Sequence, residues 1–108
     1  MIEITYHRGR HGLTVTGHAG LGVKGADPLC AAVSALTYTA GANLAELAGQ
    51  GNAQGLSMKF LPGYAKVGCQ PEKGMEQVAT LMLDTVVTGF QLLQAQWPEH
   101  IKLRLVEG

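Results

Sequence analysis

The sequence lacks a surplus of either charge, since its 8 Lys and Arg residues balance its 8 Asp and Glu residues. Without a strong positive field, broad electrostatic attraction to nucleic acid or to an anionic membrane is not expected. Aromatic residues make up only 6% of the chain, too few for a surface on which bases stack. The composition therefore argues against direct nucleic-acid binding.

Long apolar runs are also missing. The longest are far shorter than the roughly 20 residues that span a bilayer. Residues 1–6 alternate apolar and polar side chains, and they carry neither the basic region nor the apolar core of a signal peptide. We therefore expect a cytoplasmic protein with no membrane partner.

Cysteine is scarce, because Cys30 and Cys69 are the two in the chain. They are too few and too far apart for a disulfide framework or a zinc site, and in a reducing compartment both are expected to be thiols. His7, His11 and His100 have no second ligand at metal spacing, so we assign them to solvated positions. No metal is expected.

The run Gly20-x-Gly22-x-x-Gly25 matches the dinucleotide-binding fingerprint only superficially. That fingerprint requires a βαβ unit and an acidic residue on its second strand, and this sequence provides neither. No cofactor is expected.

What the sequence does contain fits one folded domain over residues 1–108, with 46% hydrophobic and 15% charged residues. Alternation of apolar and polar side chains predicts strands at residues 2–7, 13–18, 56–60, 65–69 and 101–106. Glycine and proline mark turns at residues 8–12 and at 62–63.

Two helices are predicted between these strands. The first begins with Asp27 as N-cap and Pro28 as first residue, and Gly49 and Gly51 stop it. Its apolar stripe, with spacings of three and four, is Leu29, Val33, Leu36, Ala40, Leu44 and Leu47. The second begins at Pro71 and ends at Trp97, with a buried stripe at Met75, Val78, Met82, Val86, Phe90 and Leu93. Gly41 inside the first helix costs about 1 kcal/mol relative to alanine, which indicates close packing there.

The order ββαββαβ predicts an α/β (α+β) fold. Strands with one apolar face and two striped helices are typical of a two-layer sandwich. We expect two helices covering one face of a mixed five-stranded sheet.

Four local features coincide between residues 17 and 34. His18 ends a strand, a glycine-rich loop follows at residues 19–26, Asp27 caps a helix, and Cys30 lies in its first turn. Each has an ordinary interpretation alone: a solvated histidine, an N-cap, a small buried hydrophobe. Together they provide a thiol at a helix N-terminus, which favours thiolate, and a nearby base. The N–H groups of Leu29 and Cys30 are candidate oxyanion donors.

The segments Gly17-His18-Ala19 and Gly25-Ala26-Asp27-Pro28-Leu29-Cys30-Ala31-Ala32-Val33-Ser34 resemble the bacterial ribosomal-processing cysteine protease family, Prp. The resemblance implies that Cys30 is the nucleophile and His18 the general base, with Asp27 and Ser34 in supporting positions. It also implies a homodimeric cytoplasmic peptidase. Such a peptidase removes a short N-terminal extension from large-subunit ribosomal protein twenty-seven.

Several roles stay open at this point. Asp27 either caps the helix or orients His18, and Ser34 either bonds back to the carbonyl of Cys30 or lines a substrate cleft. Pro28-Leu29 replaces the family's usual β-branched pair, which removes one N–H and puts more weight on Leu29 and Cys30 as donors. Gly20, Gly22 and Gly25 make the loop a candidate gate over the thiol.

Three alternatives to the ribosomal peptidase are distinguishable. A phage- or element-encoded relative processes a capsid protein with the same chemistry. A non-catalytic ribosome-associated binding module uses Cys30 only structurally. A thiol redox sensor uses both Cys30 and Cys69, although the sequence has no Cys-x-x-Cys motif.

Overall fold

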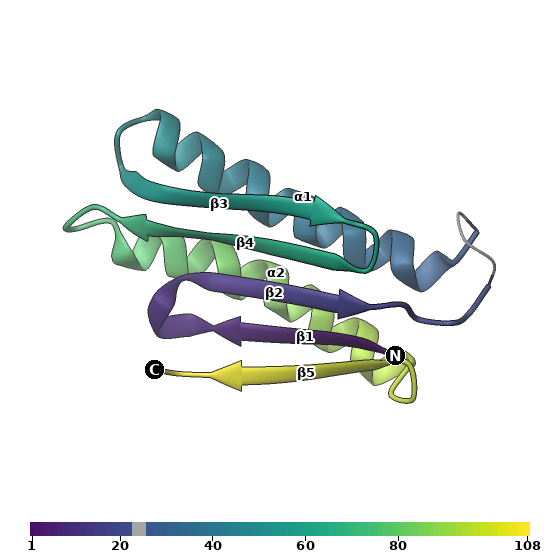
Figure 1. Ribbon diagram of the computed structural model, residues 1–108. Helices are drawn as coiled ribbons and strands as arrows, with labels where there is room; N and C mark the ends of the chain where they lie inside the picture. The colour runs from purple at the N-terminus through teal and green to yellow at the C-terminus, as the bar shows by residue number, and fades with distance from the viewer. Residues whose placement is uncertain (23–25) are drawn as a thin grey trace.

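A computed structural model describes residues 1–22 and 26–108. Over these residues the elements follow the expected ββαββαβ order, with one short 3-10 turn, η1, added after the first strand (Figure 1). Their bounds are β1 (Ile2–His7), η1 (Arg8–Arg10), β2 (Gly12–Gly17), α1 (Pro28–Gly49), β3 (Ala53–Leu61), β4 (Tyr64–Pro71), α2 (Glu76–Gln96) and β5 (Ile101–Val106).

The strands form one sheet in the order β3-β4-β2-β1-β5. β1 and β5 are parallel, whereas the other neighbouring pairs are antiparallel, so the sheet is mixed as predicted. Both helices lie behind the same face of the sheet in Figure 1. This order puts β2 at the centre, and the chain leaves the end of β2 to enter α1.

The core lies between the sheet and the helices. The predicted stripe of α1 lies inward, since Leu29, Val33, Ala40, Leu44 and Leu47 are buried and Leu36 is half-buried, and Thr37 and Gly41 are buried with it. Ile2, Ile4, Tyr6 and Leu13 of β1 and β2 are buried in the same core. Burial of one large side chain stabilises a fold by about 1.5–3 kcal/mol, which makes this stripe the anchor of α1 on the sheet.

Gly41 is buried against β3, as its position inside a helix indicates. A Cβ at Gly41 would lie 3.0 Å from Cε of Met58 and 3.4 Å from Cζ of Phe60. The missing side chain therefore lets β3 approach α1.

The predicted start of the second helix is wrong. Pro71 is the last residue of β4, paired with Ala53, and α2 begins at Glu76. The N–H of Glu72 donates to the carbonyl of Asn52, and the N–H of Met75 donates to that of Glu72, which makes a turn between the two elements. Proline suits a strand end as well as a first helical turn, because neither position needs its N–H.

The buried stripe of α2 also differs from the prediction. Val78 is 38% exposed, and the inward residues are Ala79, Leu83, Val86, Val87 and Phe90. By length and composition alone α2 is apolar enough to cross a membrane. We interpret it as a core helix, because these five residues pack in the core shared with the sheet and α1.

Gly17, the last residue of β2, has a φ of +90°, and a Cβ there would overlap the backbone carbonyl oxygen of Met1. We expect Gly17→Ala to lower the free energy of unfolding by about 1–2 kcal/mol or more, the cost of a left-handed backbone for an L side chain plus the overlap. Urea unfolding measures it. Gly49→Ala is the control: it lies in α1 with nothing within 4 Å of an added Cβ, and it should be neutral or slightly stabilising. Equal effects of the two variants would contradict the prediction.

Candidate active site

The end of β2 is held from several sides. The N–H of Gly17 donates to the carbonyl of Gly63 at 2.9 Å, and the carbonyl of His18 accepts from the Met1 ammonium at 2.6 Å. Gly63, with a φ of +71°, lies so close to the His18 ring that a Cβ there would be 2.9 Å from Nε2. The turn between β3 and β4 therefore supports the exposed imidazole.

Asp27 forms the N-cap of α1, as its position before Pro28 predicts. Its Oδ1 accepts from the N–H groups of Leu29 and Cys30, each at 3.0 Å, and its Oδ2 accepts from the N–H of Leu21 at 2.9 Å. The bond from Cys30 N–H is the largest of the causes that lower the pKa of the Asp27 carboxyl. Among the described residues no hydrogen bond joins Asp27 to His18. This structure therefore shows Asp27 as a cap that also fastens the preceding loop.

The expectation that Leu29 and Cys30 offer free N–H groups to an oxyanion is wrong for this structure. Both N–H groups donate to Asp27 Oδ1, and the N–H of Ala31 donates to the Asp27 carbonyl. The sequence argument counted the first-turn donors as unpaired, but it did not subtract those that a capping carboxylate takes.

Cys30 is partly exposed, and its sulfur accepts a hydrogen bond from a backbone N–H outside the helix. The N–H of Ala19 lies 3.4 Å from the Sγ of Cys30, although Ala19 itself is only 2% exposed. The carbonyl of Ala19 lies 2.8 Å from Nδ1 of His100. His100 is thus half-buried beside the site, and its assignment to a solvated position is wrong.

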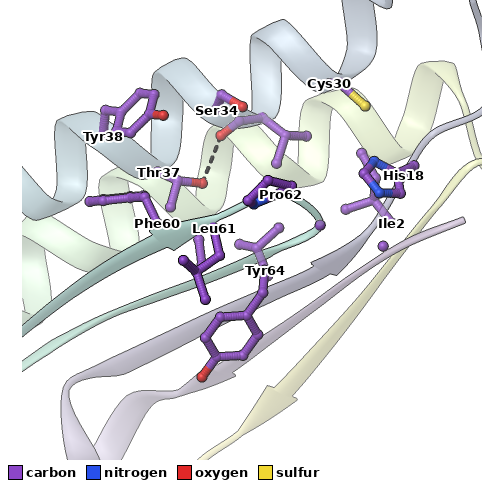
Figure 2. Close-up of a pocket in the computed structure, with 15 residues that line it drawn as sticks. Ile2, His18, Cys30, Ser34, Thr37, Tyr38, Phe60, Leu61, Pro62 and Tyr64 are labelled. Atoms are coloured by element: carbon purple, nitrogen blue, oxygen red, sulfur yellow. Dashed lines mark hydrogen bonds between the residues drawn. The ribbon is translucent and has the colours of Figure 1, made fainter. Parts of the chain in front are cut away.

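Two cavities meet at the thiol. One, of about 410 Å³, runs along α1 and under the turn between β3 and β4, and it is lined by Val33, Tyr38, Phe60 and Pro62 besides His18 and Cys30 (Figure 2). The other, of about 460 Å³, lies on the loop side and is lined by Gly20, Gly22, Asp27 and Ala31. His18, Cys30 and Ser34 line both. Figure 2 shows the Cys30 sulfur and the His18 ring at one end of the first cavity, with Tyr38 and Phe60 at the other.

The remaining candidate residues have mixed outcomes. The bond from Ser34 back to the Cys30 carbonyl is not among the hydrogen bonds of the described residues, and Ser34 is exposed in both cavities. Gly20 has a φ of +76° and Gly22 approaches the carbonyl of Ala26. Gly25 lies outside the described residues, so the loop gate stays a prediction.

Neither a metal site nor a thiol pair is found where the chain is described. Over residues 1–22 and 26–108, no group of three His, Cys, Asp or Glu side chains can hold a metal ion. Cys69 is buried, which raises the pKa of its thiol, and its N–H bonds to His11 before the start of β2. Cys30 lies beyond the other end of β2, roughly 20 Å away for six residues of strand. That separation rules out a disulfide between them without refolding.

The arrangement can perform nucleophilic chemistry on an extended chain. A thiol in the first turn of α1 and an imidazole at the end of β2 border one cleft that opens on both sides of the sulfur. The ring and the sulfur are not hydrogen-bonded to each other in the described structure. Catalytic bonds of this kind are often long in a ligand-free site and shorten when substrate binds.

Comparison with known proteins identifies relatives of the whole chain. A family model described as cysteine protease Prp matches residues 1–102. The crystal structure of SMU.848 from Streptococcus mutans is similar, with a TM-score of 0.74 and 27% identity over 100% of this chain and 96% of that one. Two structures of the essential ribosomal processing protease Prp from S. aureus each cover 96% of both chains. The complex with a covalently linked product peptide gives a TM-score of 0.72 at 22% identity, and the complex with a substrate peptide gives 0.66 at 20%. A search of curated proteins found no match.

Asp27→Ala should destabilise the fold at neutral pH, because three backbone N–H groups lose their acceptor. The pKa of this carboxyl is lowered from 3.8 in the folded state, so its contribution is present above 3.8 and is lost as the pH falls through the folded value. The difference in urea midpoint between wild type and variant should therefore be largest at neutral pH and should shrink in acid, where only the charge-dependent part of the contribution is lost. Asp27→Asn keeps one acceptor oxygen, so its urea midpoint at neutral pH should lie between those of the wild type and Asp27→Ala. A difference that persists unchanged into acid would contradict this account.

Proposed function

Because the chain belongs to the cysteine protease Prp family, we propose that it cleaves peptides with Cys30 as nucleophile and His18 as general acid and base. The observation that carries the proposal is that both side chains line the two cavities that meet at the sulfur. A peptide laid along this cleft passes the thiol with chain on either side, as an endopeptidase requires.

The reaction follows from these roles. The Cys30 thiolate attacks the scissile carbonyl carbon, a C–S bond forms, and the carbonyl π electrons move to oxygen. When the oxyanion collapses, the C–N bond breaks, and the amine leaves with a proton from His18. His18 then takes a proton from water, which attacks the thioester carbon, and breaking the C–S bond restores the thiolate and releases a carboxylic acid.

For the substrate we propose a short N-terminal extension of large-subunit ribosomal protein twenty-seven. The similar S. aureus structures are of a ribosomal processing protease and hold a substrate peptide and a covalently linked product peptide, which supports this choice. The cavity along α1 is suited to apolar side chains of such a peptide, since Tyr38 and Phe60 lie together there with ring centroids 4.6 Å apart. A capsid protein of a phage is the alternative substrate for the same chemistry.

We also propose a cytoplasmic homodimer that contacts neither nucleic acid nor membrane. Leu81 and Leu92 on α2 are 68% and 62% exposed. They are three helical turns apart and so lie on one face, which is suited to bury the same face of a second copy. The balanced charge of the chain gives nucleic acid no strong attraction.

Incubation with a synthetic peptide of the ribosomal protein extension should give one cut, and Cys30→Ala should lose roughly a thousandfold or more in kcat/KM because no other nucleophile replaces the thiol. Mass spectrometry of the products measures both. Tyr38→Ala should mainly raise KM, since that side chain lines the cavity away from the thiol.

The outcomes separate the alternatives. Cleavage of a phage capsid peptide instead would keep the chemistry and replace the substrate. A Cys30→Ala variant as active as the wild type would refute the proposed nucleophile, and no cleavage of either peptide, with slow alkylation of Cys30 by iodoacetamide in mild acid, would favour the binding module.

For the dimer, light scattering should give twice the chain mass for the wild type and the chain mass for the Leu81→Glu, Leu92→Glu double variant. Two charges on each copy of an apolar contact are costly to bury. Exposed Lys102 on β5 provides the control, since Lys102→Glu should leave the dimer intact. A monomeric wild type would exclude the dimer.

A further inference from the structure

The N–H of Ala19 is the backbone donor that the structure places against the nucleophile. It lies 3.4 Å from the Sγ of Cys30, whereas the N–H groups of Leu21, Leu29 and Cys30 are bound to Asp27 side-chain oxygens. When the thiolate attacks, the oxyanion is the former carbonyl oxygen, one bond from the carbon that is now bonded to this sulfur. It therefore arises within reach of the N–H that now points at the sulfur, which is where a stabilising donor must be.

The other end of Ala19 is fixed by His100. A carbonyl oxygen only accepts, so the 2.8 Å contact assigns the proton to Nδ1 of the His100 ring, which donates to the Ala19 carbonyl. Ala19 is 2% exposed, so this bond is shielded from competing water. With its N–H on the sulfur and its carbonyl on the ring, Ala19 is held at both ends.

The backbone of His100 is itself held in place, as that of a positioning group must be. The backbone N–H of His100 donates to the Trp97 carbonyl at 3.0 Å, and the backbone carbonyl of His100 accepts from the N–H of Ile2 at 2.8 Å. The next residue, Ile101, pairs with Ile2 in the parallel β1–β5 ladder and is 1% exposed. The backbone that carries the ring is therefore fixed at the start of β5 and is not part of a free loop.

We propose that His100 is a positioning residue for catalysis: it holds the Ala19 peptide so that the Ala19 N–H stabilises the oxyanion. This rests on the proposed function, in which Cys30 attacks the peptide. The rate of the chemical step depends on such a donor because it is fixed before charge develops on the substrate oxygen.

The test compares two substitutions of the same ring. His100→Phe keeps a ring of similar size without a donor, and His100→Asn places an amide N–H near the position of Nδ1. Removing an oxyanion donor outright costs about 10²–10³ in kcat, so loosening one should cost about tenfold. We expect His100→Phe to lose about tenfold in kcat with KM unchanged, and His100→Asn to keep the wild-type kcat. Substrate is the synthetic ribosomal protein extension peptide.

A structural role alone does not produce that pattern. Amide hydrogen exchange at Ala19 should quicken in His100→Phe and not in His100→Asn. Thr80→Val is the control, because it removes a matching 2.9 Å contact to the ring of His11 at the opposite end of β2, and it should leave kcat unchanged.

Wild-type kcat in His100→Phe, or equal losses in the Phe and Asn variants, would overturn the proposal. Should His100→Phe not fold, His100→Gln makes the same comparison, because its amide lies near the position of Nε2 and misses the Ala19 carbonyl; wild-type kcat in that variant would overturn the proposal equally. The proposed function has its own test: if Cys30→Ala cleaves the peptide as fast as the wild type, the proposed function fails whatever the His100 variants show.

Discussion

The geometry around the thiol depends on the carboxylate of Asp27. One oxygen closes the first turn of α1 and the other holds the N–H of Leu21, so a single side chain joins the helix to the loop that leads to it. Because those N–H groups stabilise its charge, the pKa of Asp27 is lowered and the cap is ionised at neutral pH. The same bonds take the first-turn donors away from the substrate. Because the cap that places Cys30 occupies these N–H groups, an oxyanion donor has to come from outside the first turn of α1.

The donor that we propose, the N–H of Ala19, lies two residues beyond the end of the central strand β2. β2 lies between β4 and β1, so its end is surrounded by neighbours: Gly63 from one side, and the starts of β1 and β5 from the other. His18 and Ala19 follow directly, with their carbonyls bound to Met1 and His100. A segment that emerges at a sheet edge would have fewer such partners. The position of the histidine and of the Ala19 N–H is thus a consequence of strand order.

Much of the fold was predictable because its signals are local. The Asp27-Pro28 start of α1 and its apolar stripe depend on residues within one or two turns of each other, and Gly41 correctly indicated a close neighbour without naming Met58 or Phe60. The start of α2 was not predictable from the sequence, because proline fits a strand end and a helix start equally well. The pairing of Pro71 with Ala53 decided between them. Val78 was misplaced because an apolar side chain at helical spacing does not say which of two adjacent faces is buried.

The sequence by itself determined the order of the elements, the motif that brings His18, Asp27 and Cys30 into one short segment, and the family to which the chain belongs, because each depends on residue types at short spacing. Only the tertiary structure decided which backbone donor faces the sulfur and what holds that donor in place. His100 and Ala19 are 81 residues apart, and the parallel pairing of β1 with β5 brings His100 to the end of β2. A hydrogen bond across that separation leaves no periodicity or spacing in the chain, since its geometry is set by the packing of strands and not by neighbouring residues.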